Sequence, residues 1–294
     1  MRAFTAAAVQ FAPEPRPDVA AALARAASWT ARCAEATGAE LIVLPETCTT
    51  GFDPALTAGE LWEIVSEIPG PVTEPLQETA REHGVHVCLG TYERGPAPGV
   101  VYNAAVLIGP GGDVLGVYRK THPFRVEDVR HGGWATPGTD VCVVDTGLGR
   151  IGMAICFDGD FPELWRVQAV RGAEVVCRPS ALLRSADIWE LTCRARAYDN
   201  HVYVVAANAV GADPAGTLYF GNSMIVTPVA EVVARAASHE GWTAARLDPA
   251  AAMAALTPGS SVPHGFDHLA ERNLELYRRH AAELLGEAAT RFPH

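Results

Sequence analysis

A short apolar run at residues 151–155 ends at Cys156 and then breaks at once into the sequence Asp-Gly-Asp. Pro162 follows at a position where the first turn of a helix would begin. The pattern predicts a strand, a sharp turn and a helix. A thiol at the tip of a buried strand is held by rigid backbone and opens onto a cleft, and a helix start beside it favours the thiolate. The alternative is that Cys156 is a small apolar core residue, so its assignment depends on the rest of the chain.

Two further apolar segments end at charged side chains. Residues 41–44 form one predicted strand, followed by Pro45 and Glu46, and residues 114–118 form another, followed shortly by Lys120. In sheets with helical crossovers, the groups at the carboxyl ends of the strands face one common crevice. We therefore expect Glu46, Lys120 and Cys156 to meet, although each charge taken singly is also consistent with an ordinary surface position.

The three segments resemble those of the nitrilase superfamily, the carbon–nitrogen hydrolases, in which a glutamate, a lysine and a cysteine act together. The resemblance covers residues 3–280 and rests on three motifs in the correct order with matching elements around them. The alternation of predicted strands and helices indicates an α/β protein with helices on both faces of a mixed sheet. The resemblance makes the expected fold more specific, namely a four-layer αββα sandwich with two sheets face to face and helix pairs outside.

The chain of 294 residues, 49% of them apolar, is long enough to bury a large core. No linker, low-complexity tract or short-period repeat divides it, so we expect a single domain over residues 1–294. A final helix is predicted over residues 269–288, where charges alternate along the sequence. We expect residues 257–294 to form a C-terminal extension at a subunit interface, and the family resemblance likewise implies a homodimer or higher homo-oligomer.

The formal net charge of −11 disfavours nucleic acid and anionic membrane surfaces as partners. No apolar run is long enough to span a membrane, and residues 1–6 lack the apolar stretch of a signal peptide. Seven cysteines at irregular spacing, without a Cys-x-x-Cys motif, favour a reducing, cytoplasmic location over a disulfide framework or a structural zinc site. Since the sequence also lacks a glycine-rich nucleotide-binding motif, we expect neither a metal ion nor an organic cofactor.

The segment at residues 121–139 has no clear periodicity and is long enough to be an active-site loop. Many members of the superfamily have a second glutamate after the lysine, which orients the lysine and the substrate, and Glu127 is the candidate for this role. Asp128 is its competitor. Further candidates for substrate binding are Trp134 in the same loop, Phe157 directly after the cysteine, and Arg178 at the end of a predicted strand.

These residue types permit hydrolysis through a covalent thioester. Glu46 can accept the proton of the Cys156 thiol, while Lys120 and a backbone N–H after Cys156 can stabilise negative charge on the attacked group. Glu46 would then protonate the leaving amine and later activate water. Cys48 is the rival nucleophile, since it lies in a predicted loop where it could be exposed.

The leading functional prediction is hydrolysis of a non-peptide carbon–nitrogen bond in a small linear amide, which releases a carboxylic acid and ammonia or an amine. Cleavage of an N-carbamoyl group and nitrile hydrolysis are the alternatives, because the same three residues serve all of these reactions. The expected partner is therefore a small amide, ureido or nitrile substrate. The alternatives of another class are a catalytically silent binding protein and an acyltransferase on the same fold.

Overall fold

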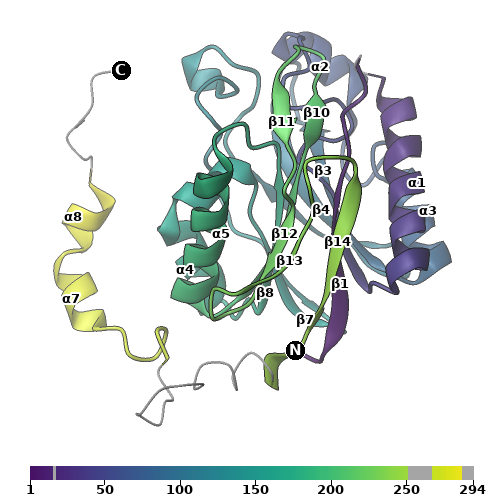
Figure 1. Ribbon diagram of the computed structural model, residues 1–294. Helices are drawn as coiled ribbons and strands as arrows, with labels where there is room; N and C mark the ends of the chain where they lie inside the picture. The colour runs from purple at the N-terminus through teal and green to yellow at the C-terminus, as the bar shows by residue number, and fades with distance from the viewer. Residues whose placement is uncertain (16–17, 251–266, 287–294) are drawn as a thin grey trace.

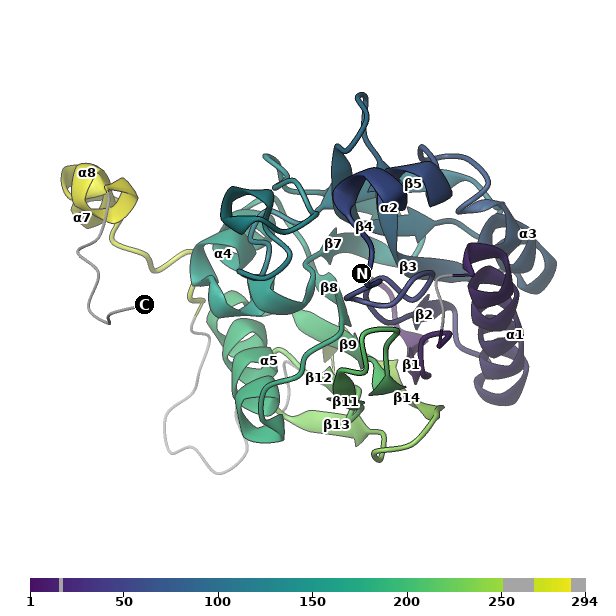
Figure 2. The same cartoon turned by 90° about the horizontal axis from the view of Figure 1, so that it is seen from above.

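Two six-stranded sheets pack face to face in the computed structural model, which describes residues 1–15, 18–250 and 267–286. Helices cover the outer face of each sheet, as Figure 1 shows. Helices α1 (Val19–Thr37) and α3 (Glu74–His83) lie on one side, and α4 (Pro162–Val170) and α5 (Ala186–Asn200) on the opposite side (Figure 2). The chain therefore folds as an α/β protein with four layers in the order αββα, as the family resemblance implies.

The first sheet has the strand order β14-β1-β2-β3-β4-β5. Its strands β1, β2 and β3 run parallel to one another, whereas the β3–β4, β4–β5 and β1–β14 pairs are antiparallel. The β4–β5 hairpin carries the chain directly to Lys120. The strands of this sheet are β1 (Phe4–Gln10), β2 (Leu41–Val43), β3 (His86–Arg94), β4 (Val101–Ile108), β5 (Val114–Arg119) and β14 (Gly241–Leu247).

The second sheet has the strand order β13-β12-β9-β8-β7-β6. Strands β7, β8 and β9 are parallel, and the flanking pairs are antiparallel. Strand β7 leads into a short 3-10 helix, η2 (Cys156–Asp160), and then into α4. The strands of this sheet are β6 (Val143–Thr146), β7 (Gly149–Met153), β8 (Val175–Ser180), β9 (Tyr203–Asn208), β12 (Met224–Val226) and β13 (Val232–Arg235).

Local signals explain where the helices begin and end. The Asp18 side chain accepts a hydrogen bond of 3.0 Å from the Ala21 amide at the start of α1, and Gly38 ends that helix at a φ of 63°. Pro162 occupies the first turn of α4, where its missing N–H costs nothing. The structure also has α2 (Ala58–Ile64), the 3-10 helix η1 (Val129–His131), and a separate hairpin of β10 (Val210–Ala212) and β11 (Leu218–Phe220).

The alternation of side chains along each strand divides the core into layers. Ala6 and Ala8 of β1 face the second sheet and pack with residues such as Ile151, whereas Ala7 and Val9 pack under α1 and α3. The inner strands of both sheets, such as β2 and β9, are therefore buried on two faces. This explains why they read as nearly continuous apolar runs in the sequence.

The C-terminal part differs from the sequence prediction. Instead of one helix over residues 269–288, two short helices form, α7 (Leu274–Arg279) and α8 (Ala281–Leu285). The Asn273 side chain accepts from the Leu276 amide at 3.1 Å and caps α7, while Asp267 organises the preceding turn. The parts of the predicted extension at residues 257–266 and 287–294 lie outside the described residues. No helix in the described ranges is long and apolar enough to cross a membrane.

Candidate active site

Glu46 lies just beyond β2, in a turn that passes very close to β3. A Cβ atom at Gly90 of β3 would lie 2.3 Å from the Pro45 carbonyl oxygen and 2.7 Å from the Cα of Glu46. Only glycine permits this approach of two backbones. The absence of a side chain at Gly90 therefore fixes where the end of β2 delivers its carboxylate.

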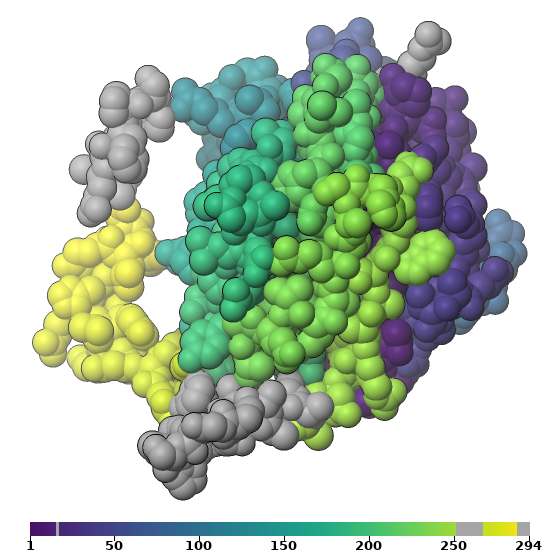
Figure 3. Space-filling model, in the orientation of Figure 1, coloured from purple at the N-terminus to yellow at the C-terminus, as the bar shows by residue number. Residues whose placement is uncertain are grey.

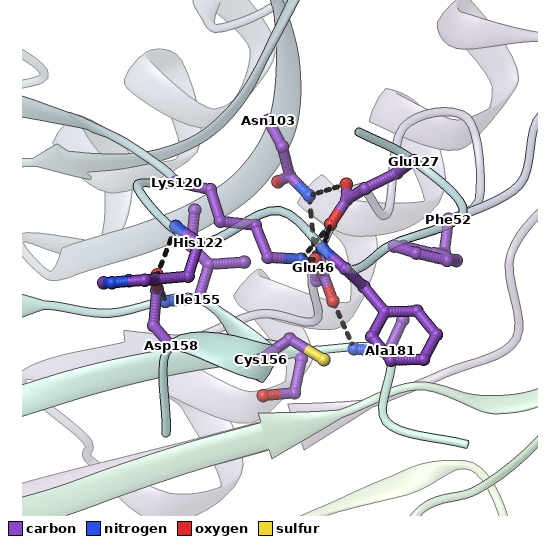
Figure 4. Close-up of polar contacts among 12 residues, drawn as sticks. Glu46, Phe52, Asn103, Lys120, His122, Glu127, Ile155, Cys156, Asp158 and Ala181 are labelled. Carbon is purple, nitrogen blue, oxygen red and sulfur yellow. Dashed lines mark hydrogen bonds and ion pairs between the residues drawn. The ribbon is translucent and has the colours of Figure 1, made fainter. Parts of the chain in front are cut away.

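The Glu46 carboxylate is buried and accepts three hydrogen bonds. Oε1 accepts from Lys120 Nζ at 2.7 Å and from Asn103 Nδ2 at 2.8 Å, and Oε2 accepts from the Ala181 amide at 2.8 Å. These donors come from three separate elements, namely the ends of β5 and β8 and the interior of β4. Figure 4 shows the carboxylate at the centre of this group. Its orientation is therefore over-determined by the surrounding structure.

Lys120 lies between two carboxylates. Its ammonium group contacts Glu46 and also forms an ion pair with Glu127, and all three side chains are excluded from solvent. Glu127 Oε1 additionally accepts from the Phe124 amide at 2.8 Å, which ties the loop after β5 back onto the lysine. Asp128, the competitor for this role, is held instead by Arg130. Of the two neighbouring acids, Glu127 faces Lys120.

Asn103 is a member of this group that the sequence analysis missed. Its amide Nδ2 donates to Glu46 Oε1 at 2.8 Å and to Glu127 Oε2 at 3.0 Å. It is positioned by β4, because the Lys120 amide donates to the Asn103 carbonyl at 2.8 Å where β4 pairs with β5. An asparagine inside an apolar strand is the signal that could have identified it, since a buried amide requires polar partners.

Burial and charge act in opposite directions on these groups. Burial alone would lower the pKa of Lys120, but the charges of Glu127 and Glu46 outweigh it and raise that pKa above its ordinary value. Burial raises the pKa of Glu127, and the like charge of Glu46 acts in the same direction against the opposing effect of Lys120. Lys120 therefore remains an ammonium ion, and Glu127 is an acid with an elevated affinity for a proton.

Cys156 begins the 3-10 helix η2 with a φ of 45°, a left-handed conformation that is uncommon outside glycine. The Arg178 guanidinium holds this turn from behind, donating to the Cys156 carbonyl oxygen from Nη2 at 2.7 Å and from Nε at 3.2 Å. A Cβ atom at Gly159 would lie 2.0 Å from the same guanidinium. Strain at a buried cysteine that is maintained by a dedicated arginine is typical of a functional position.

The expectation that the helix start favours the thiolate is not met. Burial raises the pKa of the Cys156 thiol well above its ordinary value, and the charge of Glu46 raises it further, while Lys120 and Arg178 act in the opposite direction. The thiol is therefore neutral near pH 7. A nucleophilic role for Cys156 consequently requires a base at the moment of attack, and Glu46 is the adjacent carboxylate.

A buried carboxylate joins the Cys156 and Lys120 segments. Asp158 Oδ2 accepts from the Ile155 amide at 2.9 Å and from the Tyr118 hydroxyl at 2.8 Å, and Oδ1 accepts from the His122 amide at 3.1 Å. Ile155 directly precedes Cys156, whereas Tyr118 and His122 lie two residues before and after Lys120. Asp158 therefore fixes the two segments relative to each other.

A cavity opens in front of Cys156. Its walls come from the loop after β2, the loop after β5, the 3-10 helix η2 and the segment after β8. Phe157, a predicted substrate-binding residue, is one of its aromatic walls. The lining residues are Phe52, Phe124, Cys156, Phe157, Ala181, Leu182, Leu183 and Arg184.

The sequence matches the family model described as carbon–nitrogen hydrolase over residues 5–255. This chain belongs to the carbon–nitrogen hydrolase family. A protein named nitrilase from Pyrococcus abyssi is 39% identical over 205 residues, which span 69% of this chain and 74% of that relative. The human protein named omega-amidase NIT2 is 34% identical over 218 residues, or 72% of this chain and 77% of the relative.

A solved structure is also similar. The Saccharomyces cerevisiae protein Nit3, described as a member of branch 10 of the nitrilase superfamily, matches with a TM-score of 0.76 and 26% identity. The match covers 88% of this chain and 96% of Nit3. The resemblance inferred from the three motifs is thus confirmed at the level of the family and the fold, and the chain is an enzyme of the carbon–nitrogen hydrolase class.

Two of the predicted substrate-binding residues of this hydrolase lie elsewhere. Arg178 has no exposed surface, stacks on Trp189 at 4.7 Å and acts on the backbone of Cys156, so it supports the turn instead of facing the cavity. Trp134 packs edge-on against Phe52 at 6.1 Å and donates to the Tyr92 hydroxyl at 2.7 Å. It therefore contacts the aromatic wall of the cavity without being one of the residues that line it, and its contact with substrate stays a prediction.

Cys48 is not exposed, contrary to the expectation for a loop residue. It is 2% exposed, its thiol donates to the Gly90 carbonyl at 3.3 Å, and burial raises its pKa to about 12. The thiol packs with the apolar residues between the first sheet and helices α1 and α3. Cys156 lines the cavity, and Cys48 belongs to the core.

Proposed function

We propose that this carbon–nitrogen hydrolase cleaves a small linear amide through a thioester on Cys156, releasing a carboxylic acid and ammonia or an amine. The main support is one arrangement. Cys156 lines the cavity, whereas the charged side chains of Glu46, Lys120 and Glu127 are gathered behind it in a buried network. The Ala181 amide donates to Glu46 and also faces the thiol of Cys156. The proposed acid–base residue, Glu46, and the proposed nucleophile therefore lie next to each other.

In the first half of the proposed reaction, Glu46 accepts the proton of Cys156 as sulfur attacks the amide carbon. The new carbon–sulfur bond places negative charge on the former carbonyl oxygen, which Lys120 and the Phe157 amide stabilise. Glu46 then gives its proton to the nitrogen, the carbon–nitrogen bond breaks, and the amine leaves. The raised pKa of the Cys156 thiol makes a nearby base necessary for this step.

In the second half, Glu46 accepts a proton from water as the oxygen attacks the thioester carbon. The carbon–sulfur bond breaks, the carboxylic acid is released, and the proton returns to Cys156. Glu127 does not act on the reacting atoms in this scheme. Its ion pair with Lys120, and the hydrogen bonds of Asn103 to both acids, keep the lysine charged and in place.

The names of two relatives support a small amide or a related compound as substrate. The human relative is named an omega-amidase and the archaeal relative a nitrilase. Amide cleavage is the leading proposal, and in it the negative charge that develops on the carbonyl oxygen lies beside the Lys120 ammonium. N-carbamoyl cleavage uses the same chemistry and remains the alternative reaction of this proposal.

The proposal is tested by ammonia release from matched amides, ureido acids and nitriles of equal chain length. We expect amides to be cleaved with the highest kcat/KM and Cys156→Ala to release none. Preference for ureido acids or nitriles would replace the amide assignment. Acid production that falls when an amine is added, with a new amide formed, would identify an acyltransferase. An unreactive Cys156 thiol with no turnover would identify a binding protein.

We also propose that the protein forms a homo-oligomer in the cytoplasm. Helices α7 and α8 stand away from the rest of the described chain in Figures 1 and 3. Several of their large apolar side chains are exposed. Such surfaces are normally covered by a partner. All seven cysteines are free thiols, which suits a reducing compartment. The exposed side chains are Leu274, Leu276, Tyr277, Leu284 and Leu285.

A further inference from the structure

The cavity in front of Cys156 is apolar except at one position. Among the described residues that line it, Arg184 is the only charged side chain apart from the ionisable thiol. Arg184 follows β8 in the segment that also carries Ala181, whose amide faces the thiol. A charged group in an otherwise aromatic and aliphatic lining requires a partner, because burying part of a guanidinium is costly. The cavity lining therefore combines a nucleophilic thiol with a single cationic side chain.

Asp160 holds the Arg184 guanidinium in a defined orientation. Nη2 donates to Asp160 Oδ1 at 2.8 Å, and Nη1 lies 2.8 Å from Oδ2, so the pair is bidentate. The guanidinium also lies 5.7 Å from the centre of the Phe157 ring. The Arg184 side chain is still 33% exposed. A guanidinium has five N–H donors, and the pairing with Asp160 engages one on Nη1 and one on Nη2, so that three N–H groups are not used by this ion pair.

We infer that Arg184 is a specificity-determining residue that binds a carboxylate at the end of the substrate remote from the amide. This inference rests on the proposed amide hydrolysis and deepens it, since the preferred substrate is then an amide that carries a carboxylate. The planar fork of arginine fits a carboxylate with two parallel hydrogen bonds. Aliphatic atoms between the two ends of the substrate would contact the aromatic walls.

The charge of the whole protein makes a local cation necessary for such a substrate. The formal net charge is −11, so an anion approaching the surface is repelled on average. Asp160 compensates part of the Arg184 charge. Binding must then depend on directed N–H donors more than on net charge, and losing them should cost about 10- to 100-fold in affinity.

The structural alternative is that the Arg184–Asp160 pair only fixes the end of η2. Arg196 provides a matched comparison for that role. Its Nε donates to the Gly159 carbonyl at 3.0 Å, so it stabilises the same turn, but it is not among the residues that line the cavity. The two arginines therefore separate support of η2 from contact with substrate.

The test compares two amides of equal length, the monoamide of a short dicarboxylic acid and the alkyl amide in which a methyl group replaces the carboxylate. The measured quantity is the ratio of their kcat/KM values. We expect wild type to favour the acid amide and Arg184→Gln to reduce the ratio about 10- to 100-fold, through KM. Arg184→Lys should retain an intermediate ratio, because it keeps the charge and loses the fork. Arg196→Gln should leave the ratio unchanged.

Each result bears on one of the two claims. If wild type cleaves both amides equally, or if Arg184→Gln leaves the ratio unchanged, the carboxylate assignment is wrong while amide hydrolysis stands. If neither amide is cleaved, amide hydrolysis is wrong. Calorimetric titration of the acid amide into Cys156→Ala, with and without Arg184→Gln, then still measures whether Arg184 binds the carboxylate. Circular dichroism spectra verify that each variant is folded.

Discussion

The carboxylate of Asp158 accepts a hydrogen bond of 2.8 Å from the phenolic hydroxyl of Tyr118. Tyr118 lies in β5 of the first sheet, and Asp158 lies in η2, which follows β7 of the second sheet. Tyr118 precedes Lys120 by two residues, and Asp158 follows Cys156 by two. The bond therefore joins the backbone segments that deliver the lysine and the cysteine.

Breaking this connection should reduce turnover more than substrate binding. We expect Tyr118→Phe, which leaves one buried carboxylate oxygen with fewer donors, to lower kcat about tenfold with a smaller change in KM, at a stability cost of about 1–3 kcal/mol. Tyr203→Phe is the matched control, because its hydroxyl also makes a hydrogen bond, partly buried, to the Asp248 carbonyl away from the site. Steady-state kinetics and thermal unfolding check both variants. Equal kcat values for the two variants would show that the Asp158 contact is purely structural.

The two cysteines near Glu46 should respond differently to substitution. Cys156→Ala should abolish turnover with little loss of stability, because it removes one sulfur atom at a cavity wall. Cys48→Ala should retain turnover and lose about 1 kcal/mol of stability, because it removes a packed core atom. Kinetics and chemical denaturation of both variants provide the measurement. An inactive Cys48→Ala beside an active Cys156→Ala would overturn the assignment.

The sequence was sufficient to locate Glu46, Lys120 and Cys156 at strand ends, because buried strands appear as apolar runs that stop at a polar residue. It was also sufficient for the helices whose caps are local, such as α1 with Asp18 and Gly38. These features depend on residues close together in the chain. Their prediction therefore required no knowledge of the tertiary arrangement.

The features that were missed depend on pairing between distant segments. Asn103 acts on two acids from the middle of a strand, and the register of β4 with β5 decides where it points. Arg178 was placed at the correct end of β8, but only the packing of η2 shows that it faces the backbone of Cys156 and not the cavity. Trp134 lies in the predicted active-site loop, but it packs against Phe52, which lines the cavity, and does not line the cavity itself. Loop position does not determine which side chain reaches the substrate.

The C-terminal helices should contact a second copy of the chain. Leu285 is 86% exposed and Leu284 is 61% exposed, which is costly for an isolated protein in water. We expect sedimentation velocity at micromolar concentration to show a dimer or larger assembly. Leu284→Asp combined with Leu285→Asp should shift it toward monomer, whereas Leu218→Asp, at an exposed leucine of the β10–β11 hairpin, should not. A monomeric wild-type protein would contradict this expectation.

The charge of Glu46 should be visible in the titration of Cys156. Burial and then Glu46 raise the pKa of this thiol, while Lys120 and Arg178 lower it. Replacing Glu46 by Gln removes one raising influence, so the pKa of Cys156 should fall. Because the thiolate forms above the pKa, its fraction at a fixed alkaline pH should increase in the variant. The difference in thiolate absorbance between proteins with and without Cys156→Ala measures this fraction. Glu78→Gln, at an exposed position of α3, is the control. A pKa that is unchanged or higher in Glu46→Gln would show that the carboxylate does not act on the thiol.

The same Glu46→Gln variant should turn over slowly and should accumulate a covalent acyl adduct on Cys156. Glutamine keeps the shape of the side chain and can still accept from the Ala181 amide, but it cannot take a proton. Loss of general-base assistance typically costs about 10²–10⁴-fold in a step. Acylation suffers less than deacylation, because sulfur retains intrinsic nucleophilicity and the remaining positive charges favour the thiolate, whereas water is a poor nucleophile.

The adduct therefore forms faster than it is removed, and mass spectrometry after long incubation with an amide substrate should show a mass increase equal to the acyl group. Cys156→Ala combined with Glu46→Gln is the control and should show no increase. If the Glu46→Gln protein stays unmodified and releases acid at the wild-type rate, Glu46 is not the base. Glu127 would then be the next candidate, because its pKa is raised by burial and it contacts the same lysine.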